Sequence, residues 1–204
     1  QSTGLQPDFI LARGEHVLDE PRRKKMSIFC NMSDDRIISA PDVKSIYEIP
    51  LNFERENLGN KIIKAAGLRP GKSKMDDWVK LVESIKNGKH TVKIGIVGKY
   101  FGSGAFTLAD AYLSVIEALK HAAWSEGAKP ELEWVNAEEF EKDPSSVASL
   151  SQYDGILIPG GFGSRGVEGK ISAIKYAREK KIPYFGLCYG MQLATVEFAR
   201  NVAG

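Results

Sequence analysis

The sequence predicts an α/β protein whose larger part is a parallel sheet with helices on both faces. Two observations support this prediction. After residue 90, short runs that are apolar throughout alternate with segments of helical periodicity, as expected for parallel strands that are covered on both faces. Before residue 67 a similar alternation occurs separately and ends in a stretch of turn-forming residues, which indicates the tail of another α/β domain.

The first region, residues 1–66, predicts two strands and two helices. An apolar run at 8–12 suits a buried strand, and a helical segment follows from Asp19 to Cys30. Ile37 and Ile38 predict a second strand. From Phe53 to Ala66 apolar residues, among them Leu58, Ile62 and Ile63, recur at helical spacing.

Residues 67–90 predict a connector followed by a helix. Gly67 to Lys74 combines turn formers with charge. Apolar residues then recur at i, i+3, i+4 and i+7, starting from Trp78, and Asn87-Gly88 closes the segment. A domain boundary is therefore expected within 67–90.

Residues 91–204 predict four strands that alternate with helices. The expected strands are 92–97, 132–135, 155–159 and 184–187, and the expected helices are 108–124, 167–181 and 191–202, with weak helical character at 137–150. Sites in such sheets form where the strands end and the loops leave them.

Composition limits the classes of function. The 204 residues are 43% hydrophobic and 26% charged, which suits one large globular domain, or one domain with part of another. A net charge of +2 gives no argument for nucleic-acid or anionic-membrane partners. No apolar run approaches the ~20 residues needed to span a bilayer, and no signal peptide opens the chain. Because the chain lacks an initial methionine and ends just after a helical stretch, we expect it to be the middle of a longer protein.

The two cysteines, Cys30 and Cys188, lie far apart in unlike contexts. We therefore expect no disulfide between them. We expect the protein to lie in a reducing compartment, the cytoplasm. Cys188 lies in Gly186-Leu-Cys-Tyr-Gly190, between the last strand and the last helix. This is the pattern of a nucleophile elbow, with cysteine in place of serine. Small neighbours allow the strained turn to be approached closely, and the helix N-terminus stabilises a thiolate. A buried cysteine acting as a small hydrophobe is the alternative.

A glycine-rich loop, Pro159-Gly-Gly-Phe-Gly163, follows the preceding strand. We expect it to lie beside Cys188 and to offer backbone N–H groups as the second donor of an oxyanion hole, the N–H of Tyr189 being the first. A plain turn is the alternative, because Pro-Gly and Gly-Gly are common in loops.

The two motifs together resemble the class I glutamine amidotransferases, in which the cysteine forms a glutamyl thioester and releases ammonia. Gln192 follows Cys188 by one helical turn, so its side chain can face the same pocket. The resemblance implies that Gly160, Gly161, Phe162, Tyr189 and Gln192 bind glutamine or the oxyanion.

The segments Gly98-Lys-Tyr100, 110–121, 160–169 and 199–202 further resemble the amidotransferase domain of the CTP synthase family. Residues 1–66 resemble the end of its P-loop-type synthetase domain. The resemblance implies that Lys25 contacts UTP or CTP, that Arg13, Asp42 and Val43 bind ATP, and that Arg165, Gly166 and Glu168 lie near a GTP effector site. Each role has an alternative. Lys25 could be a surface lysine, Asp42 a helix cap, and the loop at Arg165 a turn that begins a helix.

Two departures from the family are visible. Tyr189 stands where leucine is usual, and Phe101 to Phe106 is longer than the usual turn. The triad also needs a histidine and an acid, which in this family follow the nucleophile by well over a hundred residues. The three histidines present are poor substitutes. His16 lies in the first region, His90 is expected before the first strand of the second region, and His121 is expected near the end of an amphipathic helix. No metal constellation is visible.

The resemblance implies ATP-dependent, magnesium-assisted amination of UTP by ammonia from glutamine, in a homotetramer without nucleic-acid or membrane partners. The separate chain should be inactive, because half of each site is missing, and unpaired sheet edges should favour its association. Two rival hypotheses are another class I amidotransferase subunit and a non-catalytic module of the same fold.

Overall fold

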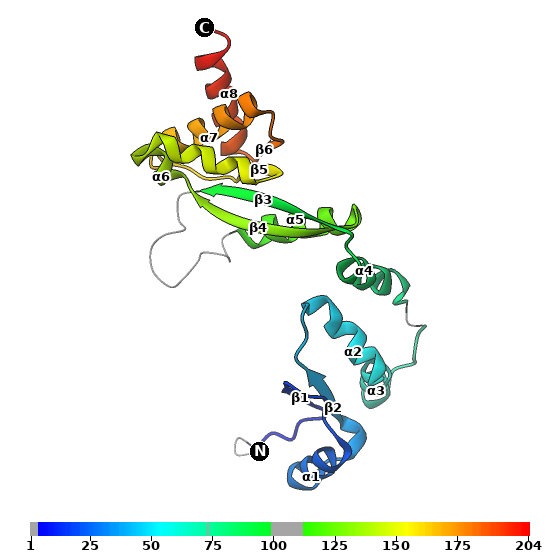
Figure 1. Cartoon of the computed structure of the whole chain (residues 1–204). Coiled ribbons are helices and arrows are strands. Elements are labelled where there is room, and N and C mark those ends of the chain that lie inside the picture. Colours follow the sequence, from blue (N-terminus) through cyan, green and yellow to red (C-terminus); the bar gives the residue numbers. More distant parts are fainter. Residues whose placement is uncertain (1–3, 73, 99–111) are drawn as a thin grey trace. The chain divides into compact units, whose positions relative to one another are not determined.

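The structure is a computed structural model that describes residues 4–72, 74–98 and 112–204. Its contacts divide the chain into two compact units, Gln1–Glu83 and Ser84–Gly204, whose elements are labelled in Figure 1. The segment 101–106 and the expected helix start at residue 108 lie outside the described residues.

The first unit contains a small parallel sheet. Strands β1 (Ile10–Gly14) and β2 (Ile37–Pro41) pair in parallel, with Ile10 opposite Ile37, so both expected strands are confirmed. The helices of this unit are α1 (Glu20–Cys30), η1 (Asp34–Arg36), η2 (Ile46–Glu48), α2 (Ile49–Arg55) and α3 (Leu58–Ala65). Helix α1 begins as expected, because the Asp19 side chain accepts a hydrogen bond from the Arg22 N–H at 2.9 Å.

The helical spacing expected between Phe53 and Ala66 corresponds to α3 together with the end of α2, and these two helices meet at Asn57. Asn57 has a φ of 54° in the left-handed region, which asparagine adopts more readily than most residues. Its carbonyl accepts the Lys61 N–H at 3.1 Å and so starts α3. Periodicity alone missed the break, since apolar residues continue at helical spacing across it.

Helix α4 (Asp76–Lys86) confirms the helix expected around Trp78. The indole Nε1 of Trp78 donates to the carbonyl of Tyr47 at 2.8 Å, and Val82 is buried. The connector before it is exposed from residue 64 to residue 72.

The second unit is built on a four-stranded parallel sheet, as predicted. The order of its strands is β4-β3-β5-β6. Its strands are β3 (His90–Gly98), β4 (Ala128–Asn136), β5 (Gly155–Ile158) and β6 (Tyr184–Gly186). His90 is the first residue of β3 rather than preceding it, which corrects the sequence expectation. Strand β4 is longer than the expected 132–135. Its residues alternate in exposure, so polar residues such as Lys129 and Glu131 interrupt the apolar run by which the sequence identified it.

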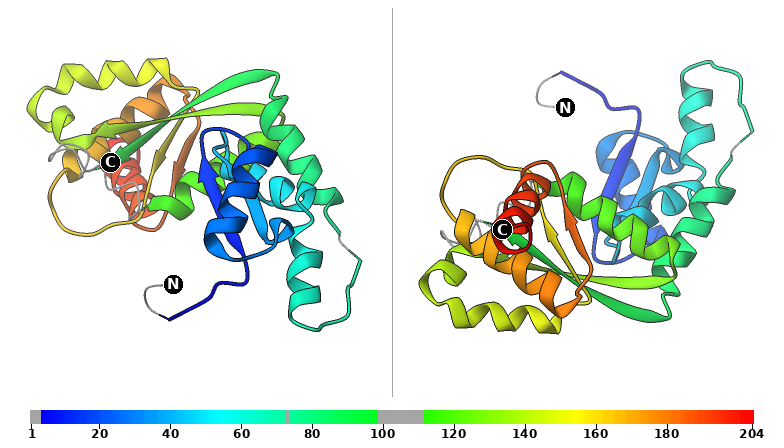
Figure 2. Two further views of the ribbon diagram at one scale, coloured as in Figure 1. Left: turned by 90° about the horizontal axis from the view of Figure 1, so that it is seen from below. Right: turned by 90° about the horizontal axis from the view of Figure 1, so that it is seen from above.

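The helices of this unit are α5 (Leu113–Ser125), α6 (Ala137–Lys142), η4 (Pro144–Gln152), α7 (Val167–Lys180) and α8 (Tyr189–Asn201). Helix α5 lies on one side of the sheet, and α6 and α7 lie on the other (Figure 1). Helix α8, drawn in red, runs beside α7 in both views of Figure 2. The sheet is therefore covered on both faces, as predicted.

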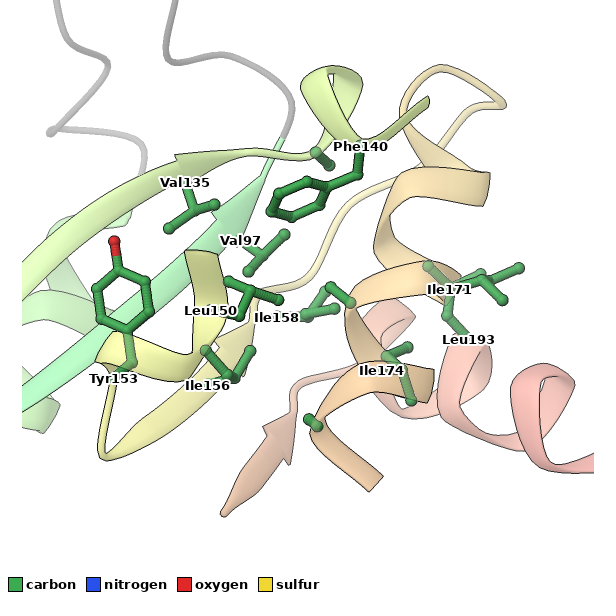
Figure 3. Close-up of a cluster of buried hydrophobic side chains, with 13 residues drawn as sticks. Val97, Val135, Phe140, Leu150, Tyr153, Ile156, Ile158, Ile171, Ile174 and Leu193 are labelled. Atoms are coloured by element: carbon green, nitrogen blue, oxygen red, sulfur yellow. The ribbon is translucent and has the colours of Figure 1, made fainter. Parts of the chain in front are cut away.

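The main core of the second unit lies between the sheet and α7. Ile156 and Ile158 of β5 point to Leu150, Ile171 and Ile174 (Figure 3). Leu157, which points the opposite way, lies in an apolar groove along α5. Because side chains alternate along a strand, β5 fills the core on both faces and carries its C-terminal loop to the sheet edge where Cys188 lies.

Candidate active site

Cys188 occupies a strained turn between β6 and α8. Its φ is 49° and its ψ is −99°, outside the regions that residues with a side chain normally adopt. Such strain persists only where the surrounding structure enforces it, and it clusters at functional sites. The side chain of Cys188 is exposed, and the residue is the N-cap of α8. The thiol is therefore accessible and lies at the positive end of a helix dipole.

The two glycines of the motif are required by close backbone approach. A Cβ on Gly190 would lie 2.2 Å from the carbonyl oxygen of Ile158, and one on Gly186 would lie 2.6 Å from the backbone of Gly190. The Tyr184 hydroxyl donates to the Gly190 carbonyl at 2.7 Å. Burial raises the pKa of Tyr184, which keeps the hydroxyl a neutral donor. The turn is thus packed directly onto the end of β5.

The glycine-rich loop lies beside the nucleophile. A Cβ on Gly160 would lie 3.6 Å from the Cβ of Cys188, and one on Gly161 would lie 4.0 Å from the Tyr189 ring. The side chain of Phe162 is 81% exposed. Strands β5 and β6 are adjacent and parallel, so their carboxyl ends bring the two motifs together.

Tyr189 and Gln192 lie in the first turn of α8. Tyr189 is the first residue of this helix. Its N–H is therefore one of the first four N–H groups of the helix, which have no acceptor within it. The Gln192 N–H donates to the carbonyl of Cys188 at 3.1 Å, and the Gln192 side chain is exposed. The arrangement can place a backbone donor and an amide side chain near a substrate bound at Cys188. Their roles stay predictions.

The histidines of this unit lie away from Cys188. His90 begins β3, at the strand end opposite to the glycine loop. The rings of His121 and Trp124 are in contact, with centroids 5.3 Å apart and planes tilted by 54°. It lies nine residues along α5 from Tyr112, about 13 Å at 1.5 Å per residue, and Tyr112 contacts the glycine loop. Neither histidine is placed to accept the thiol proton.

In the first unit, all three predicted ATP-binding residues line one cavity of about 530 Å³. These residues are Arg13, Asp42 and Val43. Arg13 Nε lies 3.1 Å from Asp42 Oδ1. The alternative role of Asp42 as the cap of the following turn is taken by Ser45, whose Oγ accepts the Tyr47 N–H at 3.4 Å. The carboxyl ends of β1 and β2 position this cavity, as expected for a ligand site on a parallel sheet.

Lys25 is not among the residues that line this cavity. It lies on α1, and its Nζ is 5.9 Å from the ring centroid of Phe29. The structure therefore does not bring Lys25 together with the other predicted nucleotide ligands.

The three predicted effector residues gather at the start of α7. Arg165 Nε lies 2.5 Å from Glu138 Oε1, and Glu168 pairs with Arg200 at 3.0 Å. Gly166 is the N-cap of α7 with a φ of 71°. These contacts fit the helix-entry alternative, and the effector role stays a prediction.

Both cysteines are free thiols. Within residues 4–72, 74–98 and 112–204, no group of three or more His, Cys, Asp or Glu side chains could hold a metal ion. In the same ranges, no helix combines the length and the apolar character required to cross a membrane.

Two protein families match the chain. "Glutamine amidotransferase class-I" matches residues 107–204, and "CTP synthase N-terminus" matches residues 1–68. These are the two parts that the sequence motifs separate.

Similar proteins cover the whole chain. A CTP synthase from Carboxydothermus hydrogenoformans is 50% identical over 100% of this chain and 37% of its own length. One from Pyrococcus abyssi is 48% identical over the same shares. The solved structure "Trypanosoma brucei CTPS - glutaminase domain with bound acivicin" has a TM-score of 0.50 and 40% identity, over 56% of this chain and 42% of that one. The chain thus spans a little over a third of the length of the relatives it matches.

Proposed function

From the membership of this chain in the CTP synthase family, we propose that it carries the nucleophile of a glutaminase site and part of the nucleotide site that uses the ammonia. The single observation that best supports the glutaminase site is the strained backbone of Cys188 beside the glycine loop. The whole protein would aminate UTP to CTP with ATP and glutamine.

At the glutaminase site, the Cys188 thiolate attacks the carboxamide carbon of L-glutamine. Negative charge develops on the carboxamide oxygen, and the N–H groups of Tyr189 and of the glycine loop are proposed to stabilise it. Collapse of the tetrahedral intermediate breaks the C–N bond. The nitrogen takes up the proton that the Cys188 thiol gave up and leaves as ammonia, and a glutamyl thioester remains. Water then hydrolyses the thioester and regenerates Cys188.

At the synthetase site, the cavity formed by Arg13, Asp42 and Val43 is proposed to contribute to ATP binding. The exposed Arg13–Asp42 pair can offer both a cation and an acceptor to a nucleotide. ATP would phosphorylate O4 of UTP, and ammonia would displace the phosphate. Magnesium would accompany ATP, as it usually does by binding the phosphates.

The domain assignment is part of the proposal. Residues 1–66 would complete the synthetase domain, 67–90 would link the domains, and 91–204 would begin the amidotransferase domain. GTP activation, a homotetramer and a cytoplasmic location also stay predictions from the family.

The test is Cys188→Ala in the full-length protein that contains this segment. Glutamine-dependent CTP formation should be abolished, because no thioester can form, while CTP formation from added ammonium salts should persist. CTP is measured directly by chromatography. A variant that loses both activities would contradict the proposed separation of the two sites.

A further inference from the structure

The glycine loop beside Cys188 has little means of holding its own shape. Gly160, Gly161 and Gly163 lack side chains, and glycine has the greatest backbone freedom of any residue. The side chain of Phe162 is 81% exposed. An oxyanion hole stabilises a transition state only if its donors are oriented before the reaction. Hydrogen bonds from residues outside the loop to its carbonyls can supply this orientation.

Two tyrosines contact this loop from different helices. The Tyr189 hydroxyl, on α8, donates to the carbonyl of Gly163 at 3.0 Å. The Tyr112 hydroxyl, just before α5, donates to the carbonyl of Gly160 at 3.4 Å. The two carbonyls bracket the stretch Gly161-Phe162, whose N–H groups are the proposed donors.

Anchoring a carbonyl also orients the next N–H. Because the peptide unit is planar and trans, its C=O and N–H point in opposite directions. A hydrogen bond from Tyr112 to the Gly160 carbonyl thus turns the Gly161 N–H away from Tyr112. The Gly163 carbonyl lies two peptide units beyond the one that contains the Phe162 N–H, so its hydrogen bond to Tyr189 tethers the far end of the stretch rather than orienting that N–H directly.

The Tyr189 ring is itself held in place. Lys170 is buried, with 3% of its surface exposed, and its Nζ lies 5.4 Å from the Tyr189 ring centroid. A cation at this distance from an aromatic ring is attracted to its face. Two contacts, one through the hydroxyl and one on the ring face, therefore fix the Tyr189 side chain against the loop.

We propose that Tyr112 and Tyr189 are positioning residues, which orient the backbone donors of the glycine loop for glutamine hydrolysis. This inference rests on the proposed function. The two hydroxyls do not bind the substrate. They affect the reaction only by holding the glycine loop in position.

The test uses Tyr189→Phe and Tyr112→Phe in the full-length protein, each of which removes only a hydroxyl. Losing one oxyanion donor outright lowers kcat by about 10² to 10³, so loosening a retained donor should cost roughly tenfold in kcat for glutamine hydrolysis. KM should change little. Tyr112→Phe should cost less, because its hydrogen bond is longer.

Two controls separate positioning from general damage. Tyr176→Phe removes another tyrosine hydroxyl that donates to a carbonyl in the same unit, that of Ala148 at 3.3 Å, and kcat should be unchanged. Alkylation of Cys188 by iodoacetamide needs a reactive thiol but no oxyanion hole, so its rate should stay within about twofold in all variants.

The inference is overturned if both tyrosine variants keep the wild-type kcat, or if alkylation slows in parallel with kcat. In those cases the proposed function still stands, provided that the wild type hydrolyses glutamine and Cys188→Ala does not. A wild-type protein that hydrolyses no glutamine overturns the proposed function and this inference together.

Discussion

At the scale of single residues, the nucleophile turn is defined by backbone proximity. Cys188 has a strained backbone, and Gly190 lies so close to β5 that a Cβ would meet the Ile158 carbonyl oxygen at 2.2 Å. That oxygen also accepts the Leu187 N–H at 2.9 Å, so it cannot move without breaking the turn. A side chain at position 190 must therefore displace α8 from the sheet.

Gly190→Ala should destabilise the second unit by about 3 kcal/mol, the upper end of the usual cost of overpacking. Urea unfolding measures this cost. Gly59→Ala is the matched control, because Gly59 is also helical and has no atom within 4 Å of the added Cβ. It should stabilise its own unit by about 0.5–1 kcal/mol. Equal stability of Gly190→Ala and wild type would contradict the close approach.

At the scale of elements, polar pairs connect helices and strands that the apolar core alone would not align. The Glu197 side chain of α8 is 1% exposed, and Arg178 of α7 lies 2.8 Å from its Oε1. Nε of Arg178 also donates to Glu197 Oε2 at 3.0 Å, so the contact is bidentate, the geometry that best offsets the burial of charge. This pair sets the register between α7 and α8, and so supports the helix that follows Cys188.

Arg178→Ala should lower the melting temperature clearly, because it leaves the Glu197 carboxylate buried without its cation. Thermal unfolding measures the loss. The matched control is Glu179→Ala, which removes a surface partner of Arg178 at 3.8 Å and should change stability by less than about 0.5 kcal/mol. Similar effects of the two substitutions would contradict a special role for the buried pair.

A second polar network joins strands β3 and β4 to Tyr153. Lys93 Nζ lies 2.9 Å from Glu133, and the Tyr153 hydroxyl donates to Glu133 at 2.8 Å. Burial, followed by the hydrogen bond to Glu133, raises the pKa of Tyr153 to about 12. Hydrogen bonds from Lys93 and then Tyr153 lower the pKa of Glu133.

The raised pKa of Tyr153 predicts a loss of stability in alkali. An unfolded tyrosine ionises near pH 10, so the contribution of Tyr153 is complete below pH 10 and declines as the pH rises toward about 12. Urea unfolding at several pH values measures the slope. Tyr153→Phe should flatten it in part, since Tyr184, whose pKa is also raised, remains. An unchanged slope in Tyr153→Phe would refute this assignment.

At the scale of the whole molecule, the chain divides into units that carry different parts of the proposed chemistry. The first unit brings Arg13, Asp42 and Val43 to one cavity, and the second brings the glycine loop to Cys188. The match of residues 1–68 to the CTP synthase N-terminus is unexpected for an unrelated amidotransferase subunit. The strained Cys188 is likewise unexpected for a module without a reaction.

The sequence by itself determined the parallel sheet and the nucleophile motif. Continuous apolar runs and glycine spacing are local signals, because they depend on neighbours along the chain. The break at Asn57, the true length of the edge strand β4 and the start of β3 at His90 were not predictable. These depend on a backbone conformation and on pairing across the sheet.

Only the tertiary structure decided what surrounds Cys188. Its sequence motif indicates a turn, but the adjacency of β5 and β6 brings Gly160 within contact of the nucleophile. The hydroxyls of Tyr112 and Tyr189 reach that loop from positions 48 and 26 residues away. Sequence spacing does not encode such contacts, because they depend on the order of the strands and on which face of the sheet each helix covers.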